Sequence, residues 1–197
     1  MRFLVVPVMA FCVAGCVTVI SPSPDAESIS RDVTITEDPF RGTLRYQGPE
    51  SKGTSSLVGS SDIEVFSMRA AQEKGRAVRY FIDVTDYYDG DWRGFDQVYD
   101  LEGNKFHALN TRHAVDCTVL CGYEEILEIE VPQEYLETHA ETGTTLRLYG
   151  PGQASSTPFE ISAGYIQGFL RGVFDTGMTP NPHHPAGQLF DSSHAIP

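Results

Sequence analysis

The sequence predicts a mainly β domain of the α+β class, an antiparallel sheet or sandwich with one or two short helices packed on it. Apolar and polar residues alternate with period two through most of residues 31–131, as they do in strands with one buried face. Two later segments, residues 132–141 and 162–174, carry a helical pattern instead. With 41% hydrophobic and 11% aromatic residues, a chain of 197 residues is typical of one globular domain.

The clearest strands are residues 78–85, in which every second residue is apolar, and residues 123–131. In the second of these Tyr123, Leu127, Ile129 and Val131 point one way and Glu124, Glu128 and Glu130 the other. An Asp89-Gly90 pair offers a hairpin turn after the first of them, because glycine tolerates a positive φ there. A second turn, Gly103-Asn104, leads into another strand, and we expect these strands to form a meander. Shorter or weaker strands are expected at residues 33–35, 40–46, 63–68, 95–101, 105–115 and 146–148.

The two helices have recognisable ends. Pro132 suits the first turn of the first helix and Gly143 is placed to end it. Ser162 can cap the second helix. Its expected buried face consists of Tyr165, Ile166, Phe169, Leu170 and Val173, and beside it runs a glycine stripe of Gly164, Gly168 and Gly172. A membrane dimer face would need a longer and less polar helix, so we expect the stripe to pack closely on the sheet.

The first 16 residues carry the strongest functional signal. Arg2 supplies a short positive region, and residues 3–13 form an apolar run of the length found in signal peptides, too short to span a bilayer. Small residues then precede Cys16. An ordinary signal peptide with an incidental cysteine, or a buried first strand, is the alternative interpretation.

The stretch Val13-Ala14-Gly15-Cys16 resembles the lipobox of bacterial lipoproteins. That resemblance covers this segment alone and implies cleavage before Cys16, whose thiol receives diacylglycerol and acyl chains such as palmitate. More than one chain, at about 0.8 kcal/mol per buried CH₂, anchors a protein stably. Position 17 is Val rather than the Asp that resembles an inner-membrane retention signal, which favours the outer membrane and a periplasmic or surface location.

The chain is expected to divide into four segments. Residues 1–15 are the signal peptide, and residues 16–30 are the lipidated cysteine with a Ser- and Pro-rich tether. Residues 31–176 are the single β-rich domain. Residues 177–197 contain several prolines and no periodicity, which predicts a flexible tail.

The charge excludes one class of partner. Lys and Arg total 14 against 27 Asp and Glu, a net charge of −13, whereas nucleic acid requires a basic surface that neutralises phosphates. We therefore expect no nucleic acid partner. The membrane, reached through the lipid, and another envelope protein or polymer are the expected partners.

Cys117 and Cys121 are the cysteines that remain in the mature chain besides Cys16. Outside the cytoplasm such a pair usually forms a disulfide, which a turn can accommodate. A zinc site with His107 and His113 and a pair of free thiols are the alternatives, but zinc motifs more often use Cys-x₂-Cys with a second pair. The sequence therefore predicts a Cys117–Cys121 bridge.

Two further groups of residues could bind metal ions. Asp86, Asp89 and Asp91 are a weak calcium candidate, since their spacing does not match an EF-hand loop and Asp and Gly favour plain turns. The nearby aromatic residues Tyr87, Tyr88 and Trp92 could serve a sugar- or peptide-binding face or fill the core. His183, His184 and His194 lie in the expected tail, which offers no fixed ligand geometry.

No catalytic motif is present: the sequence contains no G-x-S-x-G, H-E-x-x-H, Walker or dinucleotide-binding pattern. No cofactor is therefore expected. The sequence favours a non-enzymatic envelope lipoprotein that binds or scaffolds another component, with a hydrolase acting on an envelope polymer or peptide as the second hypothesis. An enzyme should show a pocket in which acids or histidines converge, and a binding module should show an exposed sheet edge or apolar patch.

Overall fold

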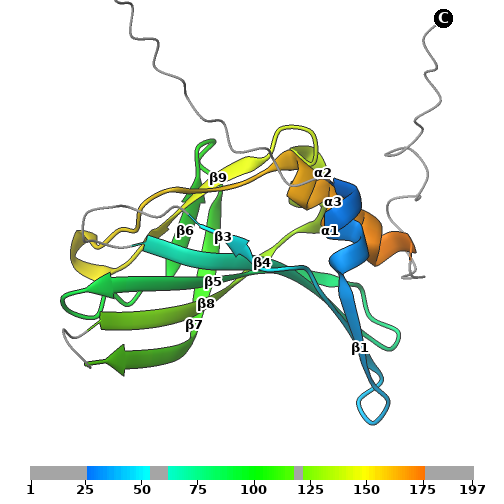
Figure 1. Cartoon of the computed structure of the whole chain (residues 1–197), viewed down its shortest axis with the longest axis horizontal. Coiled ribbons are helices and arrows are strands. Elements are labelled where there is room, and N and C mark those ends of the chain that lie inside the picture. Colours follow the sequence, from blue (N-terminus) through cyan, green and yellow to red (C-terminus); the bar gives the residue numbers. More distant parts are fainter. Residues whose placement is uncertain (1–25, 54–61, 118–121, 176–197) are drawn as a thin grey trace, which may run out of the picture.

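The computed structural model describes residues 26–53, 62–117 and 122–175. In this part of the chain ten strands form one antiparallel sheet, accompanied by three short α-helices, so the predicted fold class is confirmed. The strand order is β1-β2-β4-β5-β8-β7-β6-β9-β10, and β3 pairs with β4 beside this path. Figure 1 shows that the sheet curls into a half-barrel with a concave inner face.

Long strands build the centre of the sheet. They are β4 (Asp62–Glu73), β5 (Arg79–Asp89), β7 (Lys105–Asp116) and β8 (Gly122–Val131). One edge carries β1 (Thr34–Asp38) and β2 (Thr43–Gln47), with the two-residue β3 (Ser51–Lys52) beside β4. The other wall contains β6 (Gln97–Asp100), β9 (Thr144–Tyr149) and β10 (Phe159–Ile161). Strand β7 joins the two walls, because it pairs with β8 and, at its first residues, with β6.

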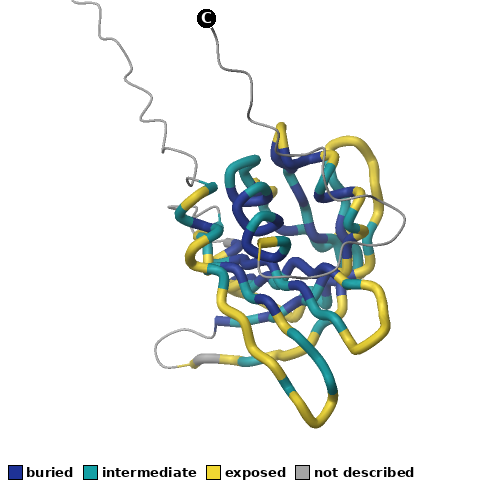
Figure 2. The backbone as a smooth tube through the Cα atoms, turned by 90° about the vertical axis from the view of Figure 1, so that its right-hand side faces the viewer, coloured by how far each residue is buried: buried dark blue, intermediate teal, exposed yellow. Residues whose placement is uncertain are grey.

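Alternation along the strands separates a buried inner face from an outer face. On β5 the inner residues Tyr80, Ile82 and Val84 are buried, and on β8 their partners Leu127 and Ile129 are also buried. The inner faces of the two walls meet each other across the core. Figure 2 shows buried positions concentrated inside the curl, whereas exposed positions follow the projecting hairpins.

Helix α3 (Ala163–Asp175) closes the core. Tyr165, Phe169, Leu170 and Val173 have no exposed surface, as the sequence predicts. The ring of Phe66 on β4 lies 5.4 Å from that of Tyr165 and 5.9 Å from that of Phe159 on β10, so the helix and both walls meet at one aromatic group. The predicted cap is also present, since the Tyr165 backbone N–H donates to the Ser162 hydroxyl at 3.2 Å.

Helix α2 (Gln133–His139) follows Pro132 as predicted. Gly143 ends the connection after it in the left-handed region, at φ +75°, and its N–H donates to the His139 carbonyl at 2.8 Å. Two short strands were not expected from the sequence: β3 and β10. Residues 54–61 lie outside the described part of the chain.

Helix α1 (Ala26–Asp32) corrects two predictions. Residues 26–30 were expected to belong to an extended tether, but they are helical, so the domain begins before residue 31. The glycine stripe was expected to pack on the sheet, but it packs on α1. A Cβ at Gly168 would lie 2.5 Å from the Ala26 carbonyl oxygen and 2.6 Å from Ile29 Cβ, so the glycine allows the two helices to touch.

The predicted hairpin at Asp89-Gly90 is wrong. Gly90 does adopt a positive φ of 107°, but β5 pairs with β4 and β8, and the chain after Gly90 crosses to β6 on the other wall. The predicted meander therefore holds for β6, β7 and β8, which pair in chain order, and a turn at Gly103 joins the first two of them. The reason is that the best partner for β5 on its open side is β8, which arrives later in the sequence and pairs along ten residues from Tyr80 to Asp89.

Candidate functional site

The structure brings few of the predicted site residues together. Cys16, Cys121 and the tail histidines lie outside the described residues, so lipidation and the Cys117–Cys121 bridge stay predictions. Intact mass before and after reduction would check the bridge. His107 and His113 lie on β7, where both are exposed.

The weak calcium candidate does not assemble. Asp86 is a strand residue with no exposed surface and lies on the inner face of β5. Asp89 and Asp91 are exposed at the end of β5 and in the following bend. Within the described residues, the one group of three or more potential ligands that converge lies elsewhere, at Asp100, Glu102 and His139.

A polar row interrupts the apolar inner face near one end of the sheet. The row consists of Asp86 on β5, Glu125 on β8 and His113 on β7, which are successive neighbours in register, and it ends at the apolar Ile63 on β4. Both carboxylates are fully buried, and the His113 Nε2 lies 3.9 Å from a Glu125 oxygen. Sequence reasoning assigned Asp86 to a turn and did not single out Glu125, because only the register brings these residues together.

Glu125 holds a loop in place. The backbone N–H groups of Gly94 and Phe95 donate to its two carboxylate oxygens at 2.8 and 3.3 Å. Beside it, burial raises the pKa of Tyr88, whose hydroxyl accepts the Arg93 N–H at 3.0 Å. Because its carboxylate is buried and already hydrogen-bonded, Glu125 positions the loop and has no surface with which to contact a substrate.

The loop places an aromatic cluster at the surface. The Trp92 ring lies 4.8 Å from His113 and 4.8 Å from Tyr123 in edge-to-face geometry, and Tyr123 stacks on Tyr88 at 6.1 Å. Tyr88 is buried, whereas 43% of Trp92 is exposed. The sequence left open whether these aromatic residues form a binding face or fill the core. Tyr88 fills the core, whereas Tyr87 and Trp92 are partly exposed.

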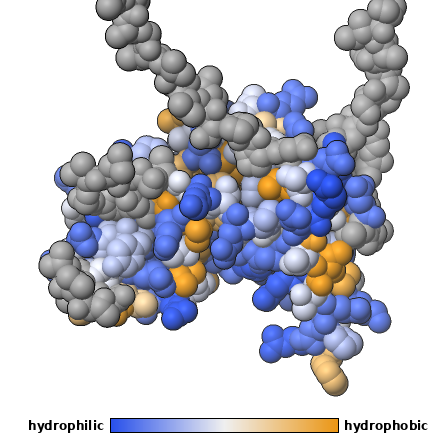
Figure 3. Space-filling view, in the orientation of Figure 1, coloured by the Kyte–Doolittle hydropathy of each residue, from blue (hydrophilic) through white to orange (hydrophobic). Residues whose placement is uncertain are grey.

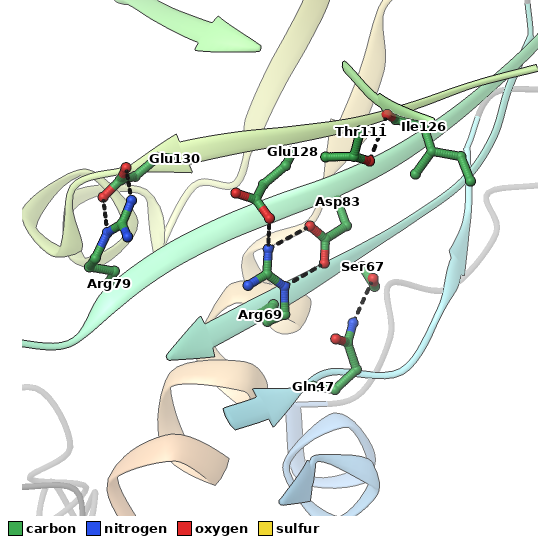
Figure 4. A network of polar contacts seen from close by, with 9 residues as sticks. All are labelled: Gln47, Ser67, Arg69, Arg79, Asp83, Thr111, Ile126, Glu128 and Glu130. Atoms are coloured by element: carbon green, nitrogen blue, oxygen red, sulfur yellow. Dashed lines mark hydrogen bonds and ion pairs between the residues drawn. The ribbon is translucent and has the colours of Figure 1, made fainter. Parts of the chain in front are cut away.

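The outer face of the central strands carries a network of ion pairs (Figure 4). Arg69 on β4 donates to both oxygens of Asp83 on β5, at 3.0 and 3.1 Å, and also to Glu128 on β8. Its guanidinium lies over the Phe81 ring, 4.3 Å from the centroid. The guanidinium thus links three adjacent strands and covers an aromatic ring that would otherwise face water.

The terminal strand β1 presents an open edge. It pairs with β2 on one side and ends the strand order on the other, and four of its five residues are exposed. Ile35 is 45% exposed, and Phe40, at the tip of the β1–β2 hairpin, is 99% exposed. Figures 1 and 2 show this hairpin projecting from the body of the molecule. Figure 3 shows a face that is mainly hydrophilic, as the acidic composition implies, with an apolar patch at the base of this hairpin.

A pocket of about 240 Å³ lies beside the wall that contains β6, β9 and β10. It is bounded by the β6–β7 turn, the end of α2 and strands β9 and β10. Asp100, Glu102 and His139 line it, and one potential ligand atom from each lies within 4.8 Å of the others. The sequence contains no spacing motif for this group, since the turn and the helix are far apart in the chain.

Comparison with protein-family models, curated proteins and solved structures found no match. Among the described helices, none is both long enough and apolar enough to cross a membrane.

Proposed function

We propose that this chain is a bacterial lipoprotein, anchored through Cys16 at the outer rather than the inner membrane, whose β domain binds or scaffolds another envelope component. The anchor is supported by the sequence Val13-Ala14-Gly15-Cys16, preceded by an apolar run of signal-peptide length. Helix α1 begins ten residues after Cys16. At roughly 3.3 Å per residue, an extended tether of that length could hold the domain about 33 Å from the membrane.

The binding role rests on the open edge of β1. An edge strand presents unpaired backbone N–H and C=O groups, with which an extended segment of a partner can pair. Ile35 lies on β1 and Phe40 lies in the turn after it, and their exposed apolar surface would be buried in such a complex. Because the hairpin projects from the body, a partner can reach this edge without displacing another element.

The buried acids do not favour the hydrolase hypothesis. Asp86 and Glu125, the two acids on the inner face, have no exposed surface, and a general acid or base must come within hydrogen-bonding distance of its substrate. The second hypothesis therefore depends on the pocket beside His139. The pKa of Asp100 there is lowered, away from neutral pH, whereas a general acid needs a raised value.

Site-specific photo-crosslinking in intact cells tests the proposed function. A photoreactive amino acid at position 35 or 40 should give a discrete crosslinked product. Position 109 is the matched control, because Leu109 is an apolar residue on β7 whose exposure, 54%, is close to the 45% of Ile35 and which lies on another part of the surface. The product should disappear when Cys16→Ser removes the anchor. Equal crosslinking at all three positions, or none at 35 and 40, would refute binding through the β1 edge.

A further inference from the structure

The pocket beside α2 is unusually rich in metal-ligating side chains. Besides Asp100, Glu102 and His139 it is lined by Glu160 on β10 and by threonines at the start of β9. No Lys or Arg is among the residues that line it. Three carboxyl groups therefore face a small volume without a basic side chain in its wall.

His139 shows which atom faces this volume. Its side chain is 6% exposed, and its Nδ1 lies 2.7 Å from the Tyr135 carbonyl oxygen. A carbonyl oxygen can only accept, so Nδ1 carries the proton and neutral His139 presents the lone pair of Nε2 to the pocket. A hydrogen bond from Nδ1 to a backbone carbonyl is also the arrangement that orients metal-bound histidines.

Nε2 then faces a second acceptor. The nearest carboxylate oxygen, Glu102 Oε1, lies 3.6 Å away. Two lone-pair atoms at this distance repel each other unless a cation, either a proton on Nε2 or a metal ion, lies between them. A proton needs one carboxylate partner, whereas a metal ion uses several, and here a third ligand atom from Asp100 lies within 4.8 Å of both.

Asp100 is fixed by its own turn. Its Oδ1 accepts the backbone N–H groups of Glu102 and Asn104 at 2.9 and 2.8 Å, and its Oδ2 accepts the Asn104 side-chain amide at 2.8 Å. Oδ1 thus accepts two hydrogen bonds, whereas Oδ2 accepts one from Asn104 and keeps a second lone-pair direction for a metal ion.

We propose that this pocket binds a divalent transition-metal ion such as Zn²⁺ through Nε2 of His139 and the carboxylates of Asp100 and Glu102. Imidazole and carboxylate together are ligands for zinc and its neighbours, whereas Ca²⁺ and Mg²⁺ take oxygen ligands alone. Three protein ligands leave a coordination position open. Glu102 is exposed on a turn, so its side chain can move the short distance that closes the ligand set.

Zinc titration against a chromophoric chelator tests the proposal. The protein is the full mature chain in detergent, stripped of metal, with His183, His184 and His194 replaced by alanine so that the tail cannot bind. One zinc ion should bind per chain, and excess Ca²⁺ or Mg²⁺ should not displace it. Cobalt in place of zinc should give the visible absorption of a low-symmetry site.

Three variants locate the ion in this background. Glu102→Gln and His139→Gln should each weaken zinc binding by roughly 10–100-fold or more, since even outer ligand partners contribute that much. Glu141→Gln is the matched control, because Glu141 is exposed nearby but does not line the pocket, and it should leave the affinity unchanged. If His139→Gln does not fold, Glu102→Gln decides the question. Unchanged affinity in Glu102→Gln, displacement by Ca²⁺, or no binding at all would overturn the proposal and leave a proton between His139 and Glu102.

Discussion

At the scale of single residues, the outer face of the sheet carries ion pairs that differ in how far they are buried, and therefore in how much they stabilise the fold. Arg69 is 11% exposed and its partners Asp83 and Glu128 are about one-third exposed or less, whereas the side chains of Arg79 and Glu130 are both more than half exposed. Charges held away from water depend on their partners, because an unpaired charge there loses its solvation. Exposed pairs contribute little, because water and salt screen them.

We therefore expect Arg69→Ala to lower the free energy of unfolding by about 2–4 kcal/mol, because it leaves Asp83 and Glu128 unpaired and uncovers Phe81. Arg79→Ala, the matched control on the same face, should cost about 0–1 kcal/mol. Urea denaturation of both variants measures the difference. Equal costs would show that the Arg69 network is no more than a surface ion pair.

The pKa of Glu130 reports directly on the ion pair between Arg79 and Glu130. Hydrogen bonds from Arg79, at 2.7 and 2.6 Å, lower the pKa of Glu130 from its usual value of 4.5. Since the folded pKa is lowered, the pair stabilises the fold above pH about 4.5 and this contribution disappears as the pH falls through the folded value. NMR titration should show the pKa of Glu130 returning towards 4.5 in Arg79→Gln. An unchanged pKa in that variant would contradict the assignment.

At the scale of elements, strands and helices with a strong periodic pattern were predictable, and their partners were not. The alternation of β5 and β8 and the apolar face of α3 follow from residue types that are local in the sequence. The row of Asp86, Glu125 and His113 depends on register between strands whose order the sequence does not specify. Helix α1 buries a single residue, Ile29, so it has no periodic pattern to detect.

The candidate metal ligands were missed for a similar reason. Asp100 and Glu102 lie in a turn, and Asp and Gly residues favour turns whether or not a ligand binds there. His139 lies in the last turn of a short helix. Their convergence depends on how α2 packs against the second wall. The proposed anchor, in contrast, rests on consecutive residues alone, because a lipobox is a local motif.

The packing of α3 gives the prediction at this scale. Phe169 is fully buried and touches the region of Gly48, where a Cβ would lie 3.0 Å from its ring. We expect Phe169→Ala to cost about 3–5 kcal/mol, since it leaves a cavity in the core. Truncation after residue 178 should cost little, because a proline-rich tail without periodicity has few groups to bury. Thermal melting compares the two proteins, and an equal loss of melting temperature would show that the tail is part of the fold.

At the scale of the whole molecule, we propose that a lipid anchor and a short tether are joined to a half-barrel whose terminal strand is open. In this proposal the anchor keeps the domain at a membrane, and the tether sets how far the β1–β2 hairpin can reach. The strongly acidic composition favours solubility of the domain and disfavours direct docking on anionic lipid. Binding through β1 and metal binding beside α2 use different walls of the sheet, so each can be tested without the other.

The measurement that tests the central claim most directly is mass spectrometry of the N-terminal peptide from the mature protein, purified from bacterial membranes. The wild-type protein should begin at Cys16 and carry the mass of a diacylglycerol group with its acyl chains. The Cys16→Ser protein should carry no lipid and should leave the membrane fraction. A mature wild-type protein that begins beyond residue 16, or that begins at Cys16 with an unmodified thiol, would contradict the account.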